Sequence, residues 1–296
     1  MGPVEGEPAP TAVVTGATSG VGAEVALGLA RRGFRVVVVG RDPSKCEAMR
    51  RRLATVGGPT PPPAVVADLA RTHAVEAAAR TVRASHPRVE LLVNNAGAVF
   101  AHREETDEGH ERTFALNVLA PFLLTRRLEP ALVAAGGGAR VVNVVSEAHR
   151  HAHVHLSDLE SRARYRGFRA YGRSKLALLL LTYAFARRWP PERIAFFGVH
   201  PGFVASGFGR NNRGAFGFAV RLAMTFAIPV EQGAVPVLFA ATADRLVGAT
   251  GGYVVHETTA RSSERSYDAA AGERLWSEVE RAVDRAAPTG PAGATP

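Results

Sequence analysis

The sequence predicts an α/β protein with a doubly wound, mostly or wholly parallel sheet of seven strands and helices on both faces. Short runs rich in β-branched residues alternate with helical patterns along the chain, as in successive βαβ units. Most of these runs are apolar throughout, which indicates strands buried on both faces, as in parallel sheets. Together these two observations favour a Rossmann-type fold.

The predicted elements follow one another without a break. The strands cover residues 12–15, 35–39, 64–67, 91–94, 140–145, 194–199 and 253–255. A first helix, which contains Val21, ends at Gly33, a residue that commonly stops helices. Two longer amphipathic helices are expected over 106–135, closed by three glycines, and over 168–189, stopped by two prolines.

No internal repeat or shift in composition divides the chain. The Gly- and Pro-rich segment 57–63 is expected to be a loop rather than a linker, because the βα alternation continues through it. We expect one domain over residues 11–286, a flexible leader over 1–10 and a flexible tail over 287–296.

Composition excludes several classes of protein. The chain is 46% hydrophobic and 21% charged, so it can build a large core and is not globally disordered. Its single cysteine, Cys46, rules out a disulfide framework and a cysteine-based zinc cluster. No run approaches the ~18 apolar residues that span a bilayer, and the acidic N-terminal segment is unlike a signal peptide. A cytoplasmic protein without a membrane span is expected.

The formal net charge of +9 raises nucleic acid or an anionic ligand as a partner. The basic residues are scattered, however, and many share predicted helices with glutamate. We therefore expect a basic surface and no nucleic-acid partner.

A glycine-rich turn joins the first strand to the first helix. Its glycines follow the pattern Gly-x-x-x-Gly-x-Gly, which allows a tight turn and brings backbone N–H groups close to a pyrophosphate at a helix N-terminus. Its place inside a βαβ unit is the context that a dinucleotide site requires. The residues expected to contact the cofactor are Gly16, Thr18, Ser19, Gly20, Val21 and Gly22.

The end of the second strand indicates which dinucleotide binds. An acid there would bind the ribose 2′-hydroxyl of NAD, whereas an arginine can pair with the 2′-phosphate of NADP. Arg41 stands at this position, 21 residues beyond Gly20. Asp42 could contact the ribose only if the strand ended one residue later. NADP(H) is therefore expected, with NAD(H) as the alternative.

Four ordered motifs resemble the short-chain dehydrogenase/reductase family of the classical type. They are the turn from Thr15 to Gly22, Asn-Asn-Ala-Gly from residue 94, Tyr-Gly-Arg-Ser-Lys from residue 171 and His-Pro-Gly from residue 200. The resemblance covers residues 11–283. Segments around Ser146 and Tyr171, and Leu275-Trp276 near the end, are most similar to the retinol dehydrogenase-like branch.

The resemblance implies further cofactor contacts. Asp68 and Leu69 correspond to residues at the adenine edge. Asn95, Ala96 and Gly97 correspond to residues that line the adenosine ribose and stabilise the central sheet. Pro201, Gly202, Val204 and Ser206 match the segment that contacts the nicotinamide, with serine at 206 where the family usually has threonine.

Four residues are the expected catalytic set: Asn117, Ser146, Tyr171 and Lys175. Tyr171 and Lys175 are four residues apart and share one helix face. We expect the Lys175 ammonium and the oxidised nicotinamide to lower the Tyr171 pKa, so that Tyr171 acts as general acid in reduction and general base in oxidation. Ser146 would hold the substrate oxygen, Lys175 the nicotinamide ribose, and Asn117 a water of a proton relay.

Two segments stay open to interpretation. His149, His151, His153 and His155 alternate along one segment. They could form a metal site, but a polar, mobile loop is the reading we prefer, so no metal is expected. Residues 203–229 occupy the family's substrate loop and are rich in phenylalanine, which suits a lipophilic alcohol or ketone but also packing within the fold or between subunits.

The leading function is thus the NADP(H)-dependent interconversion of an alcohol and its ketone or aldehyde. A non-catalytic NADP-binding sensor or scaffold is the alternative, and the intact catalytic set argues against it. Because family members pair the helices predicted over 106–135 and 168–189, a homodimer or homotetramer is expected.

Overall fold

The computed structural model describes residues 9–204 and 228–285, and its sheet has the strand order β3-β2-β1-β4-β5-β6-β7-β8. All neighbouring strands are parallel except β7 and β8. The strands are β1 (Thr11–Thr15), β2 (Arg35–Gly40), β3 (Val65–Val66), β4 (Leu91–Asn94), β5 (Ala139–Val144), β6 (Ile194–His200), β7 (Gly252–Val255) and β8 (Thr258–Ala260).

The doubly wound fold predicted from the sequence is confirmed, but the prediction of seven strands was one short. β8 runs antiparallel to β7, with Tyr253 opposite Ala260. It has three residues, all exposed, so it lacks the apolar run that marks the other strands.

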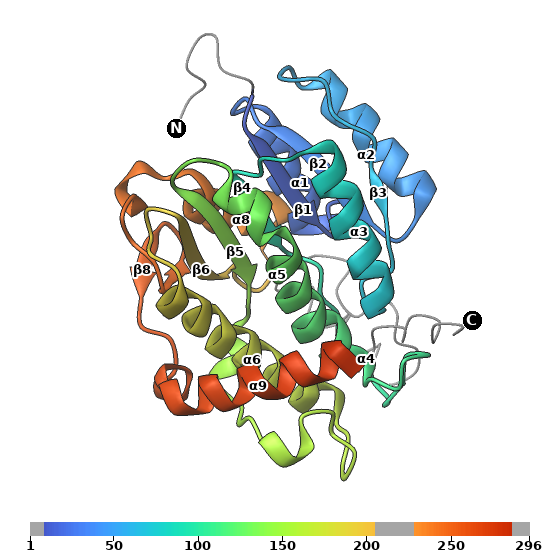
Figure 1. The fold of residues 1–296 in the computed structure, drawn as a ribbon, viewed down its shortest axis with the longest axis vertical. Coiled ribbons are helices and arrows are strands. Elements are labelled where there is room, and N and C mark those ends of the chain that lie inside the picture. Colours follow the sequence, from blue (N-terminus) through green and yellow to red (C-terminus); the bar gives the residue numbers. More distant parts are fainter. Residues whose placement is uncertain (1–8, 205–227, 286–296) are drawn as a thin grey trace, which may run out of the picture.

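Helices cover both faces of the sheet (Figure 1). One apolar core lies under α1 (Gly20–Ala30), α2 (Pro43–Thr55) and α8 (Val230–Thr242). The other lies under α3 (Thr72–Ser85), α5 (Ala120–Val133) and α6 (Gly167–Arg188). The short helices are α4 (Arg112–Phe114), η1 (Ala115–Leu119), η2 (Glu147–His151), η3 (Leu156–Asp158), η5 (Asp244–Leu246) and η6 (Glu264–Tyr267).

The helix predicted over 106–135 begins later than expected. The carboxylate of Glu111 accepts hydrogen bonds from the N–H groups of Thr113 (2.7 Å) and Phe114 (2.9 Å) and so caps α4. The chain continues through η1, a single π-helical turn, into α5. The helix predicted over 168–189 is confirmed as α6.

The C-terminal helix α9 (Ala269–Arg285) packs against α6 and η1, and Figure 1 shows it crossing α5 and α6. The ring centroid of Trp276 lies 4.9 Å from that of Phe122 and 4.5 Å from that of Phe185. Arg188 lies over the indole at 3.9 Å. The face of α5 and α6 that was expected to pair with a second subunit is therefore partly covered by the chain itself.

Among residues 9–204 and 228–285, no helix combines the length and the apolar character needed to cross a membrane.

Candidate active site

The strand order reverses direction between β1 and β4, and the loops after these strands diverge to opposite faces of the sheet. In open α/β sheets, ligands bind at this point, beyond the carboxyl ends of the strands. The turn after β1, the loop after β4, the end of β5 and the start of α6 provide the predicted site residues in this region.

The glycine turn after β1 has the shape that its sequence predicts. Gly16 and Gly20 have φ values of +64° and +57°, a conformation that L side chains rarely adopt. A Cβ atom on Gly22 would collide with the carbonyl of Gly16 and with the side chain of Asn95. The N-cap residue of α1, Ser19, makes no side-chain cap, so the first turn of α1 keeps its backbone donors for an anion.

The loop after β4 is tied to this turn. The hydroxyl oxygen of Thr15 accepts hydrogen bonds from the N–H groups of Asn95 and Ala96, both at 3.0 Å. Asn95 Nδ2 donates to the Thr15 carbonyl at 2.9 Å. Asn95 therefore holds the diverging ends of β1 and β4 together, and its side chain packs under the glycine turn.

The end of β2 lies against the same turn. Thr18 packs on Gly40, the last residue of β2, because a Cβ there would come 2.9 Å from Thr18 Cγ2. Arg41 follows and is exposed. Asp42 caps α2, since its Oδ1 accepts from Lys45 N at 3.1 Å. The carboxylate of Asp42 thus has a structural role, while Arg41, the residue after Gly40, is exposed.

After β3, Asp68 and Leu69 begin the loop that leads to α3. Asp68 Oδ1 accepts from Ala70 N at 3.2 Å, and Leu69 is buried. Asp68 therefore shapes its own loop.

Tyr171 and Ser146 meet between α6 and the end of β5. Gly172 allows this approach, because a Cβ at that position would lie 2.9 Å from the carbonyl oxygen of Ala148 in η2. A hydrogen bond joins the hydroxyls of Ser146 and Tyr171. Lys175 lies one turn further along α6, with Nζ 5.7 Å from the centroid of the Tyr171 ring.

Burial dominates the electrostatics of this pair. It raises the pKa of Tyr171 to about 12, although the hydrogen bond to Ser146 acts in the opposite direction. It also lowers the pKa of Lys175 to about 8. In the protein without cofactor, burial of the phenol therefore determines the direction of this pKa. The expectation that Lys175 and the oxidised nicotinamide together lower the Tyr171 pKa stays a prediction. Tyr171 is protonated at neutral pH and suited to donate a proton.

Lys175 and Asn117 lie behind the loop after β4. Lys175 Nζ donates to the Val144 carbonyl at 2.8 Å. A Cβ on Gly97 would lie 3.2 Å from both Lys175 Nζ and Asn117 Oδ1. The absence of a side chain at Gly97 therefore lets the loop after β4 lie close against Lys175 and Asn117.

The side chain of Asn117 connects three segments. Its Nδ2 donates to the Ala98 carbonyl at 3.0 Å and to Ser174 Oγ at 2.9 Å, and its Oδ1 accepts from Ala98 N at 3.0 Å. Asn117 lies in the π-helical turn η1, a feature frequent at functional sites. Its side chain fixes the loop after β4 against α6, and the proton relay stays a prediction.

The segment after β6 is described only in part. Pro201 and Gly202 follow the strand, Gly202 with a φ of +87°. Val204 is buried and pairs with Ile228 in an isolated bridge. Ser206 lies outside the described residues, as does most of the predicted substrate loop.

The four histidines do not share a face. His149 is fully buried, whereas the rings of His153 and His155 stack on each other in an exposed segment, 6.3 Å apart. Across the described ranges, no three His, Cys, Asp or Glu side chains are grouped as metal ligands. The burial of His149 was not predicted, since the alternation of histidines suggested a solvated loop.

Two buried polar groups below the site were also missed. Asn94 Nδ2 donates to Asn143 Oδ1 at 2.8 Å, and Asn143 Nδ2 donates to Thr182 Oγ1 at 2.9 Å. They join β4, β5 and α6. Asparagines inside otherwise apolar strands were the available signal.

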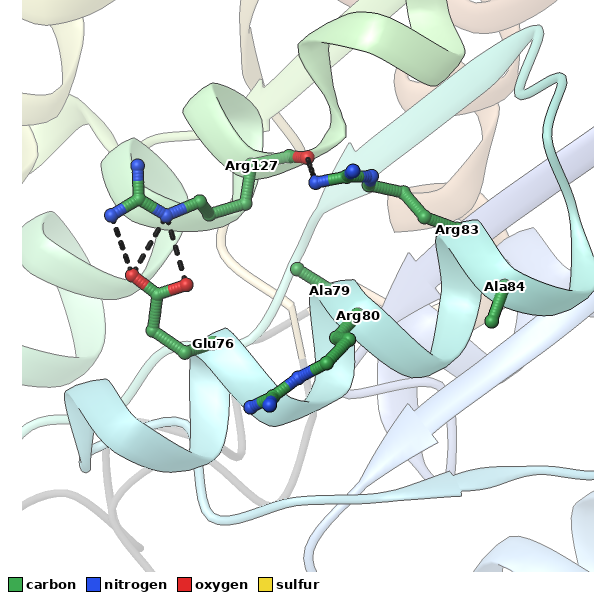
Figure 2. Close-up of a pocket in the computed structure, with 6 residues that line it drawn as sticks. All are labelled: Glu76, Ala79, Arg80, Arg83, Ala84 and Arg127. Atoms are coloured by element: carbon green, nitrogen blue, oxygen red, sulfur yellow. Dashed lines mark hydrogen bonds and ion pairs between the residues drawn. The ribbon is translucent and has the colours of Figure 1, made fainter. Parts of the chain in front are cut away.

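A separate groove of about 540 Å³ lies between α3 and α5 (Figure 2). Arg80, Arg83 and Arg127 line it, and Arg127 Nε binds Glu76 at 2.7 Å. The groove includes none of the predicted site residues that the structure describes.

Comparisons with known proteins agree with this geometry. The family model described as short chain dehydrogenase matches residues 10–215. The "Putative daunorubicin C-13 ketoreductase DnrU" of Streptomyces sp. (strain C5) is 34% identical over 282 residues, which cover 95% of each chain. Human retinol dehydrogenase 13 is 33% identical over 291 residues, 95% of this chain and 87% of the relative.

Among solved structures, the RhlG/NADP active-site complex of Pseudomonas aeruginosa has a TM-score of 0.64 at 28% identity and covers 83% of this chain and 93% of its own. The resemblance to the retinol dehydrogenase-like branch, predicted from the motifs, is confirmed by the relatives.

Proposed function

The chain belongs to the short-chain dehydrogenase family, and from this premise we propose that it is an NADP(H)-dependent oxidoreductase that interconverts an alcohol and its ketone or aldehyde. The convergence of Tyr171, Ser146 and Lys175 beyond the carboxyl end of β5 is the observation that carries the proposal. The family membership establishes oxidoreductase chemistry on alcohol or carbonyl groups, and the cofactor, the catalytic residues and the substrate are our proposal.

In the reductive direction, Ser146 and Tyr171 hold the carbonyl oxygen between their hydroxyls. NADPH, when bound, supplies the hydride to the carbonyl carbon. Tyr171 donates its proton to the oxygen as the C=O π bond breaks, so that hydride and proton together yield the alcohol. In oxidation Tyr171 accepts the hydroxyl proton, and the positive charge of Lys175 favours the phenolate that this step requires.

The choice of NADP(H) rests on Arg41 and Asp42. Arg41 is exposed beside the glycine turn, and Asp42 is occupied as the N-cap of α2. The guanidinium can therefore bind a 2′-phosphate, whereas the carboxylate would have to leave its cap to bind a 2′-hydroxyl. The Pseudomonas structure is an NADP complex, which supports the same choice.

We infer a lipophilic substrate. Phe168 precedes Tyr171 by one turn of α6 and is 54% exposed, and Phe203 is 51% exposed beside the nicotinamide segment. Exposed aromatic side chains this near in sequence to the proposed catalytic and nicotinamide-binding residues suit an apolar carbonyl compound. The names of the relatives, a daunorubicin ketoreductase and a retinol dehydrogenase, point to the same class. A cytoplasmic location and a homo-oligomer stay predictions.

Titration of the purified protein with NADPH and with NADH, followed by nicotinamide fluorescence, tests the cofactor. We expect tighter binding of NADPH, and a preference for NADH would move the ribose contact to Asp42.

Absorbance at 340 nm with daunorubicin or all-trans-retinal then tests turnover. Tyr171→Phe should abolish turnover and retain NADPH binding, whereas retained turnover would refute the role of Tyr171. Binding without turnover of any carbonyl compound would favour the sensor.

A further inference from the structure

His149 is the buried histidine next to the catalytic region, and it is 0% exposed. Its Nδ1 lies 2.6 Å from the carbonyl oxygen of Ser146, and its Nε2 lies 3.1 Å from the backbone nitrogen of Ser263. Its ring packs edge-on against Tyr253, with centroids 5.3 Å apart. The imidazole thus joins the end of β5 to the segment that follows β8, 114 residues further along the chain.

The partners fix the protonation state of the ring. The backbone nitrogen of Ser263 can only donate, so Nε2 must carry a lone pair. The carbonyl of Ser146 can only accept, so Nδ1 must carry the hydrogen. His149 is therefore neutral, in the Nδ1–H tautomer. Protonation of Nε2 would place its N–H against the N–H of Ser263. Burial also disfavours the charged ring and lowers the pKa of His149.

Ser146 depends on this ring for its position. Its carbonyl accepts two hydrogen bonds from His149, one from Nδ1 and one from the backbone nitrogen at 3.1 Å. Its hydroxyl accepts from Ala148 N at 3.3 Å. On the strand side, Val145 N donates to Val199 O at 2.8 Å. The side chain of His149 thus ties the Ser146 carbonyl directly to the segment after β8.

We propose that His149 is a positioning residue for the reaction: its Nδ1–H holds the Ser146 carbonyl and so aims the Ser146 hydroxyl at Tyr171. The inference rests on the proposed function, because Ser146 matters for turnover only if the chain reduces or oxidises a substrate. His149 itself does not touch the reacting atoms.

The charged and titratable groups around the ring come from three elements. On η2 these are Glu147, Arg150 and His151, on β6 His200, and on β7 Tyr253. Glu147 accepts from the Tyr253 hydroxyl at 2.8 Å and pairs with Arg150. This carboxylate is therefore occupied, and it leaves Nδ1 of His149 to Ser146.

Two isosteric substitutions separate the two hydrogen bonds of His149. Asparagine places its Nδ2 donor where histidine has Nδ1, so His149→Asn keeps the bond to Ser146 and loses the one to Ser263. Glutamine places a polar atom where histidine has Nε2, so His149→Gln keeps the bond to Ser263 and loses the one to Ser146. Both remove the ring, so its packing is lost in each variant.

We expect His149→Gln to lower kcat about 10- to 100-fold, as misplacement of a catalytic group does, and His149→Asn to stay within about 3-fold of the wild type. The NADPH dissociation constant should be unchanged in both. Turnover is followed with NADPH and daunorubicin or all-trans-retinal, with thermal melting as the measure of folding. Equal losses of kcat in the two variants, in step with their melting temperatures, would mean a structural role only and overturn the proposal.

NMR of the protein labelled with ¹⁵N-histidine gives a second reading that needs no substrate. The His149 signals are assigned by their absence from the His149→Asn spectrum. We expect the Nδ1–H tautomer at neutral pH, because the Ser146 carbonyl accepts from Nδ1 and the Ser263 nitrogen donates to Nε2. An Nε2–H tautomer would refute the hydrogen bond from Nδ1 to Ser146. A wild type that binds NADPH but reduces neither compound would instead count against the proposed function. The tautomer would still test the hydrogen bond from His149 Nδ1 to the Ser146 carbonyl.

Discussion

We expect Lys175 to lose its proton near pH 8 in the folded protein. Its side chain is buried, with the residue 3% exposed, and Nζ donates to the Val144 carbonyl at 2.8 Å. Burial lowers its pKa from 10.5 to about 8, because water no longer solvates the ammonium.

The sign of the effect on stability follows from proton binding. Between pH 8 and pH 10.5 the unfolded chain holds a proton on this lysine and the folded chain does not, so the free energy of unfolding rises with pH. Near pH 7 both states are protonated, so the free energy of unfolding changes little with pH there. At pH 9.5 the two pKa values give a gain of ~2 kcal/mol in the free energy of unfolding relative to pH 7.

The chain has two lysines, Lys45 and Lys175, which makes a direct measurement possible. Protein labelled with ¹³Cε-lysine should give two signals, and the signal that is absent from the Lys175→Met spectrum should titrate near pH 8. Urea unfolding of the wild type and of Lys175→Met at pH 7 and 9.5 measures the stability. The wild type should gain ~2 kcal/mol over the variant between these pH values.

Lys45→Met is the matched control, since the Lys45 side chain is 67% exposed. It should follow the pH dependence of the wild type. If the Lys175 signal titrates above pH 10, or if Lys175→Met and the wild type change in parallel with pH, then burial does not lower the pKa of Lys175 and this prediction is wrong.

Three further outcomes are expected. Arg41→Ala should weaken NADPH binding about 10- to 100-fold and leave the NADH dissociation constant within about 2-fold of the wild type. Fluorescence titration measures both, with Arg51→Ala as the control, and an equal loss for both cofactors would contradict the 2′-phosphate contact. Gly22→Ala should abolish cofactor binding and cost about 1–3 kcal/mol of stability, since its Cβ collides with Gly16 and Asn95. Calorimetric titration measures the affinity, and a wild-type affinity would mean that the glycine turn tolerates a side chain at this position. Trp276→Ala should lower the free energy of urea unfolding by about 3–5 kcal/mol, whereas the control Ser277→Ala, at an exposed position, should leave it unchanged. Equal free energies of unfolding for the two variants would mean that α9 is not part of the core.

The strands and the glycine turn were predictable because local chemistry determines them. Apolar β-branched runs mark strands buried on both faces, and Gly16 and Gly20 adopt positive φ values that other residues avoid. The meeting of Ser146 and Tyr171 was predictable for a different reason. Their motifs match a family, and the family fixes which elements lie together.

Features that depend on distant contacts were not predictable. His149 looked like one of four solvated histidines, and its burial follows from Ser263, which approaches only when the chain after β8 folds back. The depth at which the Tyr171 hydroxyl is buried, which raises its pKa in the protein without cofactor, depends on the packing of α6 against η2 and not on its neighbours in sequence. The start of α4 depends on the carboxylate of Glu111 acting as a cap.

The segment after β7 accounts for three of the features that were not predicted. β8 extends the edge of the sheet, Ser263 receives His149, and α9 covers part of α5 and α6. The same stretch of about thirty residues therefore contacts the segment after β5 through His149 and covers part of the surface that was expected to form a dimer. If copies of this chain pair through α5 and α6, they must do so around α9, with its Arg126–Glu280 and Arg187–Glu273 ion pairs at the boundary. Removal of the Trp276 anchor should then change both the association state and the stability, whereas a dimer built elsewhere would lose stability alone.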